Sequence, residues 1–273
     1  MKELLESDYI VGHNISSRGV TVVPEFTDSV DFDLKDDFPI EILPLGMGQL
    51  SIHNEKGNLE IIHYENFVNQ CKRPASFLRG RCKCDLILTC IDNRETVLLI
   101  EMTSTLGSIA NLQKAIVRET DGATAFPGGK FEKCEFQLYS SLRDLMYVQS
   151  ISEVLNAYAK RICLMAYKIE PYRDTSIIHT RPYSRYLQIE SKATSDNGAI
   201  IPCPTIEALG FEYRRIEHSY VFSYKGLAMK TVSDTISRLA HFIMSLEFQQ
   251  RFRCGLDFRT CPLLSESTNV ISR

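Results

Sequence analysis

The chain has 273 residues, a hydrophobic content of 44% and a formal net charge of -3 at pH 7. This length allows one large core or one core with a small appendage, and the charge excludes attraction of nucleic acid through an overall positive field. No apolar run approaches the roughly 20 residues of a membrane helix, and the N-terminus lacks the pattern of a signal peptide, so we expect a cytoplasmic protein that does not enter a membrane.

Residues 1–58 contain turn formers and short extended runs, at 19–24 and 39–44. The acidic stretch 28–37 is typical of a solvated loop. We therefore expect 1–58 to be a mostly extended elaboration of the domain that follows.

Two short apolar runs, at 84–88 and 98–103, each contain one acid and are separated by turn-forming residues. They predict an antiparallel hairpin in which Asp85 lies directly opposite Glu101. Opposed residues have Cβ atoms roughly 5 Å apart, where two carboxylates destabilise the pair unless a cation lies between them. This pattern indicates a site for Mg²⁺ or Mn²⁺, which oxygen ligands favour. The alternative is that both acids are polar residues at solvated strand ends.

An amphipathic helix is predicted over 133–148, where apolar residues recur at spacings of three and four. Lys133 and Gln137 flank the apolar stripe, so both side chains are expected at the rim of the sheet that the helix covers. A short helix near 64–71 precedes the hairpin, and a buried strand near 161–167 follows the long helix. The order is thus an Asp strand, a Glu strand, a helix with Lys-x-x-x-Gln, and a returning strand.

This order resembles the PD-(D/E)XK nuclease superfamily over about residues 65–168. The resemblance implies a restriction-endonuclease-like α/β fold, a central mixed sheet flanked by helices with the acids on its hairpin. It also implies that Asp85 and Glu101 bind the metal, with the Met102 carbonyl as a third oxygen ligand, and that Lys133 and Gln137 occupy the helix positions of the motif. Glu65 would match an additional acid found in some members.

The chain departs from the superfamily motif at Thr103, where a lysine is expected. Threonine cannot orient or activate water as an ammonium group does. Lys133, or less favourably Lys114, would then supply the charge for metal-dependent phosphodiester hydrolysis. The alternative is a catalytically degenerate nuclease-like scaffold that binds nucleic acid or a partner protein.

A basic cluster precedes the Asp85 strand and would bring a phosphate backbone toward the acids. It consists of Lys72, Arg73, Arg79, Arg81 and Lys83. The alternative is a solvated basic loop. We expect nucleic acid as the substrate, DNA more than RNA. The near-neutral charge favours a subunit of a larger complex, with a protein partner such as an ATPase or helicase, and the resemblance makes antiviral defence one setting for it.

The nine cysteines lie mostly in apolar runs, which indicates buried thiols in a reducing compartment. Residues 169–226 are irregular and extended, and a long helix is predicted over 230–251. We expect one elaborated α/β domain, with 1–58 as the N-terminal elaboration, 59–168 as the nuclease-like core, and 169–273 as a C-terminal extended segment and helix.

Overall fold

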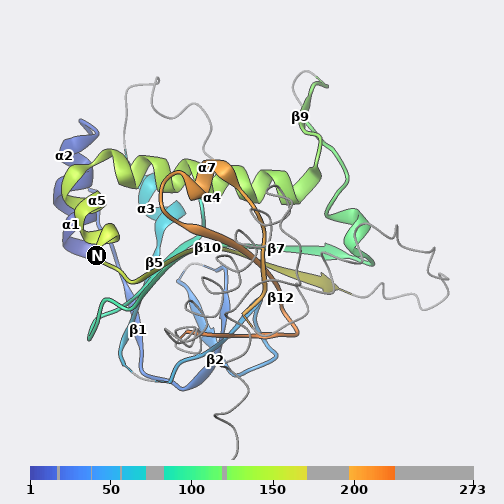
Figure 1. Cartoon of the computed structure of the whole chain (residues 1–273), viewed down its shortest axis with the longest axis horizontal. Coiled ribbons are helices and arrows are strands. Elements are labelled where there is room, and N and C mark those ends of the chain that lie inside the picture. The colour runs from blue at the N-terminus through green and yellow to red at the C-terminus, as the bar shows by residue number, and fades with distance from the viewer. Residues whose placement is uncertain are drawn as a thin grey trace, which may run out of the picture. The chain divides into compact units, whose positions relative to one another are not determined.

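A computed structural model describes residues 1–16, 19–37, 39–55, 57–71, 83–118, 122–170 and 197–224 (Figure 1). The chain divides into two compact units, Met1–Gly226 and Leu227–Arg273, and every described residue lies in the first unit. The long helix predicted over 230–251 lies outside the described residues.

A large mixed sheet forms the centre of the first unit. Seven strands of the described residues pair in the order β1-β5-β6-β7-β10-β12-β11. Their bounds are β1 Glu25–Thr27, β5 Leu59–His63, β6 Leu86–Cys90, β7 Thr96–Leu106, β10 Lys160–Glu170, β11 Ala199–Ile200 and β12 Glu212–Glu217. The pairs from β1 to β7 are antiparallel, β10 runs parallel to both β7 and β12, and β11 is antiparallel to β12.

Helices cover one face of this sheet (Figure 1). The longest is α4, Gly129–Tyr147, and its buried Leu138, Leu142 and Leu145 belong to the same apolar core as Leu99 of β7 and Met165 of β10. This helix begins four residues before the predicted start and ends one residue before the predicted end. The other helices contributing to this core are α1 Lys2–Leu4, η1 Leu5–Tyr9, α2 Ile10–Gly12, α3 Tyr64–Gln70, α5 Gln149–Asn156 and α7 Pro204–Glu207.

A four-stranded sheet lies on the other side of the large sheet (Figure 1). Its order is β13 Val221–Ser223, β4 Leu50–His53, β2 Asp31–Lys35 and β3 Glu41–Leu43. The Lys168 ammonium of β10 donates to the Gly48 carbonyl at 3.1 Å, which ties the two sheets together. The large sheet is therefore covered on both faces, and its central strands are apolar on both sides.

The N-terminal region differs from the sequence prediction in two places. Lys2–Gly12 is helical rather than extended, because its apolar residues pack into the core on the helix side. The solvated loop predicted over 28–37 is wrong, since β2 runs through it and both Phe32 and Leu34 are buried. Charged residues alternate with Phe32 and Leu34 in this segment, so its composition resembles that of a solvated loop. The two apolar side chains are buried because the segment pairs within the second sheet.

The remaining short elements precede α4. They are the 3₁₀ turn η2, Ile109–Asn111, and the hairpin strands β8, Ile116–Val117, and β9, Thr124–Phe126. Within the described part of the chain, no helix has the length and apolar character needed to span a membrane. The first unit is thus a mixed α/β structure in which a large sheet is flanked by helices.

Candidate metal centre

The strand register brings Asp85 and Glu101 together. In the β6–β7 ladder Leu86 pairs with Ile100 and Ile87 with Leu99. Asp85 is the residue before β6, so one further step along the same register places it opposite Glu101. This agrees with the register expected from the length of the hairpin loop. Side-chain alternation then points both carboxyl groups to the face covered by α4.

Both carboxyl groups are nearly removed from water, each residue being 4% exposed. Asp85 Oδ2 accepts the Met102 N–H at 2.6 Å, whereas Glu101 Oε2 is buried and has no hydrogen-bond partner among the described residues. Burial raises the pKa of Asp85 well above its ordinary value, and the nearby negative charge of Asp36 adds to the effect. Burial also raises the pKa of Glu101, followed in size by the charge of Asp85.

Two further acids lie in the surroundings of this pair. Glu65 is in the first turn of α3, and the Tyr64 N–H at the start of that helix donates to the Asp85 carbonyl at 2.8 Å. Asp36 follows β2, and its Oδ1 lies 3.3 Å from His63 Nε2. Burial raises the pKa of Glu65, and the negative charge of Asp36 raises it further. The negative charges of Asp36 and Glu65 therefore both act on the Asp85–Glu101 pair near the start of α3.

Glu65 was anticipated from the resemblance, but Asp36 was missed. Asp36 sits in a charged run with no motif around it. Its approach to the pair depends on the packing of β2 against the large sheet, for which the sequence carries no local signal.

Helix α4 supplies the positive charge of the site. Lys133 is half-buried on this helix, and its ammonium charge favours the ionised forms of both acids, which lowers the pKa of Asp85 and of Glu101 against the effect of burial. No hydrogen bond or ion pair joins Lys133 to either acid within the described ranges. The ammonium thus acts on the pair through space rather than by contact.

Gln137 links α4 to the start of the hairpin. Its Nε2 donates to the Lys83 carbonyl at 3.0 Å, and the residue is buried. Its Oε1 is buried without a partner in the part of the chain that the structure describes. Gln137 therefore positions the segment that carries Asp85, and it presents an unused acceptor beside it.

Lys83 occupies a different position from the one expected for the basic cluster. Its ammonium is buried, 2.6 Å from Asp144 Oδ2 and 2.9 Å from Ser140 Oγ of α4. The side chain is therefore directed into the protein and is not placed to contact a phosphate backbone. Lys72, Arg73, Arg79 and Arg81, the other members of the cluster, lie outside the described residues.

The alternative lysine is not part of the site. Lys114 lines a separate depression at the ends of β7 and β10. Thr103 is half-buried on β7, level with Tyr167 of β10. Of the two lysines considered, Lys133 is the one whose positive charge acts on the acid pair.

The donor set fits a hard divalent cation. It offers two opposed carboxylates, one with a buried oxygen that lacks a partner. The N–H and C=O groups of one strand residue point to the same neighbouring strand, so the Met102 carbonyl is directed to the side on which its N–H meets Asp85. No group of three or more His, Cys, Asp or Glu side chains in the described ranges is already arranged around a metal position. An ion bound here would draw its other ligands from backbone oxygen and water.

The described cysteines give no second metal centre. Cys84, Cys90, Cys134, Cys163 and Cys203 are free and buried, and Cys71 is buried as well, as the apolar context predicts. Comparison of the chain with protein-family models, with curated proteins and with solved structures found no match.

Proposed function

We propose that this protein is a metal-dependent nuclease of the PD-(D/E)XK type, in which Asp85 and Glu101 hold Mg²⁺ or Mn²⁺ and the substrate is a nucleic-acid phosphodiester. In this proposal the sheet around β6 and β7 corresponds to a restriction-endonuclease-like core. The comparisons offer no relative, so the proposal depends on the chemistry of the site.

One observation carries the proposal: two carboxylates face each other across a hairpin in a site almost without water, and one oxygen of Glu101 has no partner there. Buried carboxylates of a purely structural kind normally pair with cations or hydrogen-bond donors. Glu60 is such a case on the same sheet, since it binds the N-terminal ammonium group and the Thr89 hydroxyl. Among the described residues the Glu101 carboxylate has only the Cys134 thiol, 4.0 Å from Oε1, and its Oε2 has no partner, so a divalent cation would complete the compensation.

In this proposal each residue of the site has a separate role. Asp85 and Glu101 hold the ion, with the Met102 carbonyl as a third oxygen, and Met102 N–H keeps the Asp85 carboxylate oriented. When bound, the ion polarises a phosphate oxygen and lowers the pKa of water. Lys133 adds a positive charge beside the reacting phosphate and stabilises the negative charge that grows in the transition state. Gln137 positions the strand start that carries Asp85.

A second candidate function is a nuclease-like binding subunit without catalysis. Two observations favour it: Thr103 stands where the motif lysine is expected, and one Asp85 oxygen is already engaged by Met102 N–H. In either case the burial of Lys83 and the net charge of -3 of the whole chain weaken the attraction of the protein for nucleic acid. We therefore infer that a partner protein, such as an ATPase or helicase, brings the substrate.

A cleavage assay separates the two candidates. Single-stranded and double-stranded DNA and RNA are incubated with the purified chain in Mg²⁺ or Mn²⁺, alone and with co-purifying proteins. We expect cleavage that is lost in Asp85→Asn and in Glu101→Gln. Glu95→Gln, an exposed acid in the loop of the same hairpin, is the matched control and should cleave like the wild type. Divalent-cation binding without cleavage of any substrate would support the binding subunit and reject the nuclease.

A further inference from the structure

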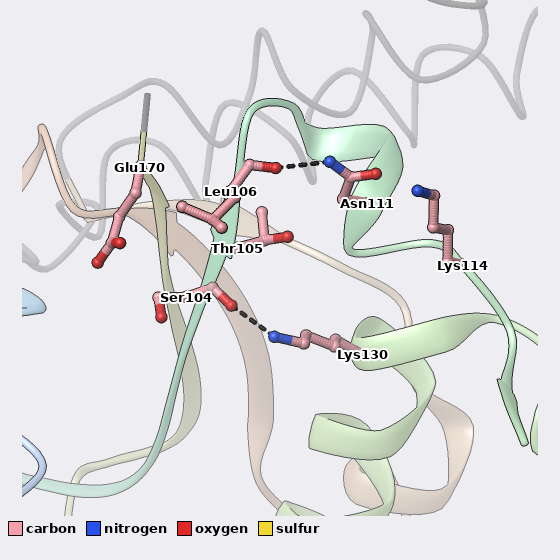
Figure 2. Close-up of a pocket in the computed structure, with 7 residues that line it drawn as sticks. All are labelled: Ser104, Thr105, Leu106, Asn111, Lys114, Lys130 and Glu170. Atoms are coloured by element: carbon pink, nitrogen blue, oxygen red, sulfur yellow. Dashed lines mark hydrogen bonds between the residues drawn. The ribbon is translucent and has the colours of Figure 1, made fainter. Parts of the chain in front are cut away.

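A depression of about 390 Å³ opens where the parallel strands β7 and β10 end (Figure 2). Ser104, Thr105, Leu106, Asn111, Lys114, Lys130 and Glu170 line it. Ligands of open α/β sheets tend to bind beyond the carboxyl ends of parallel strands, because the loops that leave those ends form a crevice there. None of the functional roles assigned above uses this depression.

The depression gathers positive charge on one side. Figure 2 shows the Lys114 and Lys130 side chains on one side of β7, together with Thr105, and the Glu170 carboxylate on the other side. Lys130 Nζ donates to the Ser104 carbonyl, which leaves further ammonium protons for a ligand. Lys114 is exposed and has no hydrogen bond or ion pair among the described residues.

The backbone holds these two lysines together. The Lys130 N–H donates to the Leu112 carbonyl at 2.6 Å, so the loop carrying Lys114 is bound to the first turn of α4. Gly129 makes the close approach feasible: its φ is +71°, and a Cβ there would lie 2.4 Å from the Leu112 carbonyl oxygen. The start of the 19-residue helix α4 adds the positive end of its dipole to the same place.

We propose that the lysine side of this depression binds a phosphate group of a nucleic-acid strand, held by Lys114, Lys130 and the Thr105 hydroxyl. This rests on the proposed nuclease function, because the strand would continue from there to the acids. Lys130 and Lys133 are three residues apart on α4 and so lie on one side of the helix. Thr105 is four residues beyond Glu101 on β7, or about 13 Å at the usual rise per strand residue. The bound phosphate would therefore lie a few nucleotides from the scissile one on the same strand.

The test measures how binding depends on salt. A fluorescein-labelled single-stranded DNA is titrated with the full chain in EDTA, where no metal-dependent cleavage occurs, at several salt concentrations. Each lost phosphate contact lowers the slope of log K against log salt by roughly 0.7 for single strands. We expect this loss, with weaker binding, in Lys114→Gln and in Lys130→Gln. Lys160→Gln removes one charge at the opposite end of β10 and should keep the wild-type slope.

A second arm identifies the source of the phosphate. A strand with one neutral methylphosphonate should lose affinity for the wild type at one backbone position, and the loss at that position should be smaller for Lys114→Gln, which keeps only Lys130 and Thr105 as contacts. Unchanged slopes in both lysine variants, with circular dichroism showing a folded chain, would overturn the proposal. Inorganic phosphate or pyrophosphate that binds in a Lys114-dependent way while the strand does not would also overturn it, in favour of a free-phosphate site. Lysine-dependent slopes without any cleavage would reject the nuclease and leave the phosphate site standing.

Discussion

Burial decides the chemistry of Asp85 and Glu101 at the scale of single residues. The same face of the hairpin would carry two ordinary ionised acids if water reached it. Instead each residue is 4% exposed, and burial is the largest cause of the raised pKa of both. Lys133 opposes this shift without contacting either group. Protons and a bound cation would therefore compete for the same two carboxylates, next to the positive charge of Lys133.

The stability of the metal-free chain should fall as pH rises above about 4. The folded pKa values are raised above 3.8 and 4.5, so the folded state binds more protons than the unfolded state in the window from those values up to the folded ones. Stability then falls with pH by at most about 1.4 kcal/mol per pH unit for each proton. Urea denaturation in EDTA across this window measures the slope. Glu101→Gln should flatten it, and an equally steep fall in that variant would place the cause elsewhere.

Lys133→Ala should change catalysis and metal binding in opposite directions. Removal of the ammonium eliminates a charge that stabilises the transition state, so the cleavage rate should drop by about a hundredfold or more. The same change removes repulsion of the cation, so Mg²⁺ should bind more tightly by calorimetry. Lys160→Ala serves as the control with neither effect. Weaker metal binding in Lys133→Ala would contradict the position assigned to this charge.

At the scale of elements, α4 is held to the hairpin by buried polar contacts as well as by its apolar stripe. Lys83 bridges Ser140 and Asp144, Gln137 binds the Lys83 carbonyl, and Ser141 Oγ accepts the Cys84 N–H at 2.7 Å. These contacts all lie within two residues of Asp85 in sequence. They fix where the Asp85 strand begins, and hence where its carboxyl group meets Glu101.

Lys83→Met should destabilise the fold by about 3 kcal/mol, because it leaves Asp144 buried with only the exposed Arg143 beside it. The double variant Lys83→Met with Asp144→Leu should recover part of the loss, since no buried charge remains. Urea denaturation measures both. Lys83→Met that keeps wild-type stability and instead loses affinity for nucleic acid would restore this lysine to the phosphate-binding role expected from the sequence.

At the scale of the whole molecule, the site exists because two sheets and a helix layer meet at one point. β6 and β7 supply the pair, α3 and α4 close one side, and β2 of the second sheet brings Asp36. The negative charges of Asp36 and Glu65 add to the raised pKa values of Asp85 and Glu101, so the ionised pair is unfavourable in the metal-free fold. A cation that binds only the folded state would relieve this.

Mg²⁺ or Mn²⁺ should therefore raise the melting temperature of the first unit. Binding at a hundredfold excess over Kd contributes about 2.7 kcal/mol to folding stability. Asp85→Asn should reduce the shift strongly, whereas Glu95→Gln on the hairpin loop should keep it. Differential scanning fluorimetry with and without EDTA is the measurement, and equal shifts in the wild type and Asp85→Asn would argue against an ion at this pair.

Local pattern in the sequence determined the elements whose contacts are local. The turn length and the period-2 alternation set the register that places Asp85 opposite Glu101, and the spacing of apolar residues marked α3, α4 and β10. These features depend on neighbours close in the chain, so one sequence is enough to read them.

The other features of the site depend on packing between segments that are distant in the chain. Lys83 is buried because it binds a partner 61 residues away in the chain. The position of Asp36 depends on the second sheet. Lys114 and Lys130 lie near each other because the backbone approaches closely at Gly129. The sequence does not distinguish an exposed charged residue from a buried and ion-paired residue of the same type. What distinguishes them is which distant segment packs over them, because long-range packing sets the solvation of each group and with it the chemistry the group can perform.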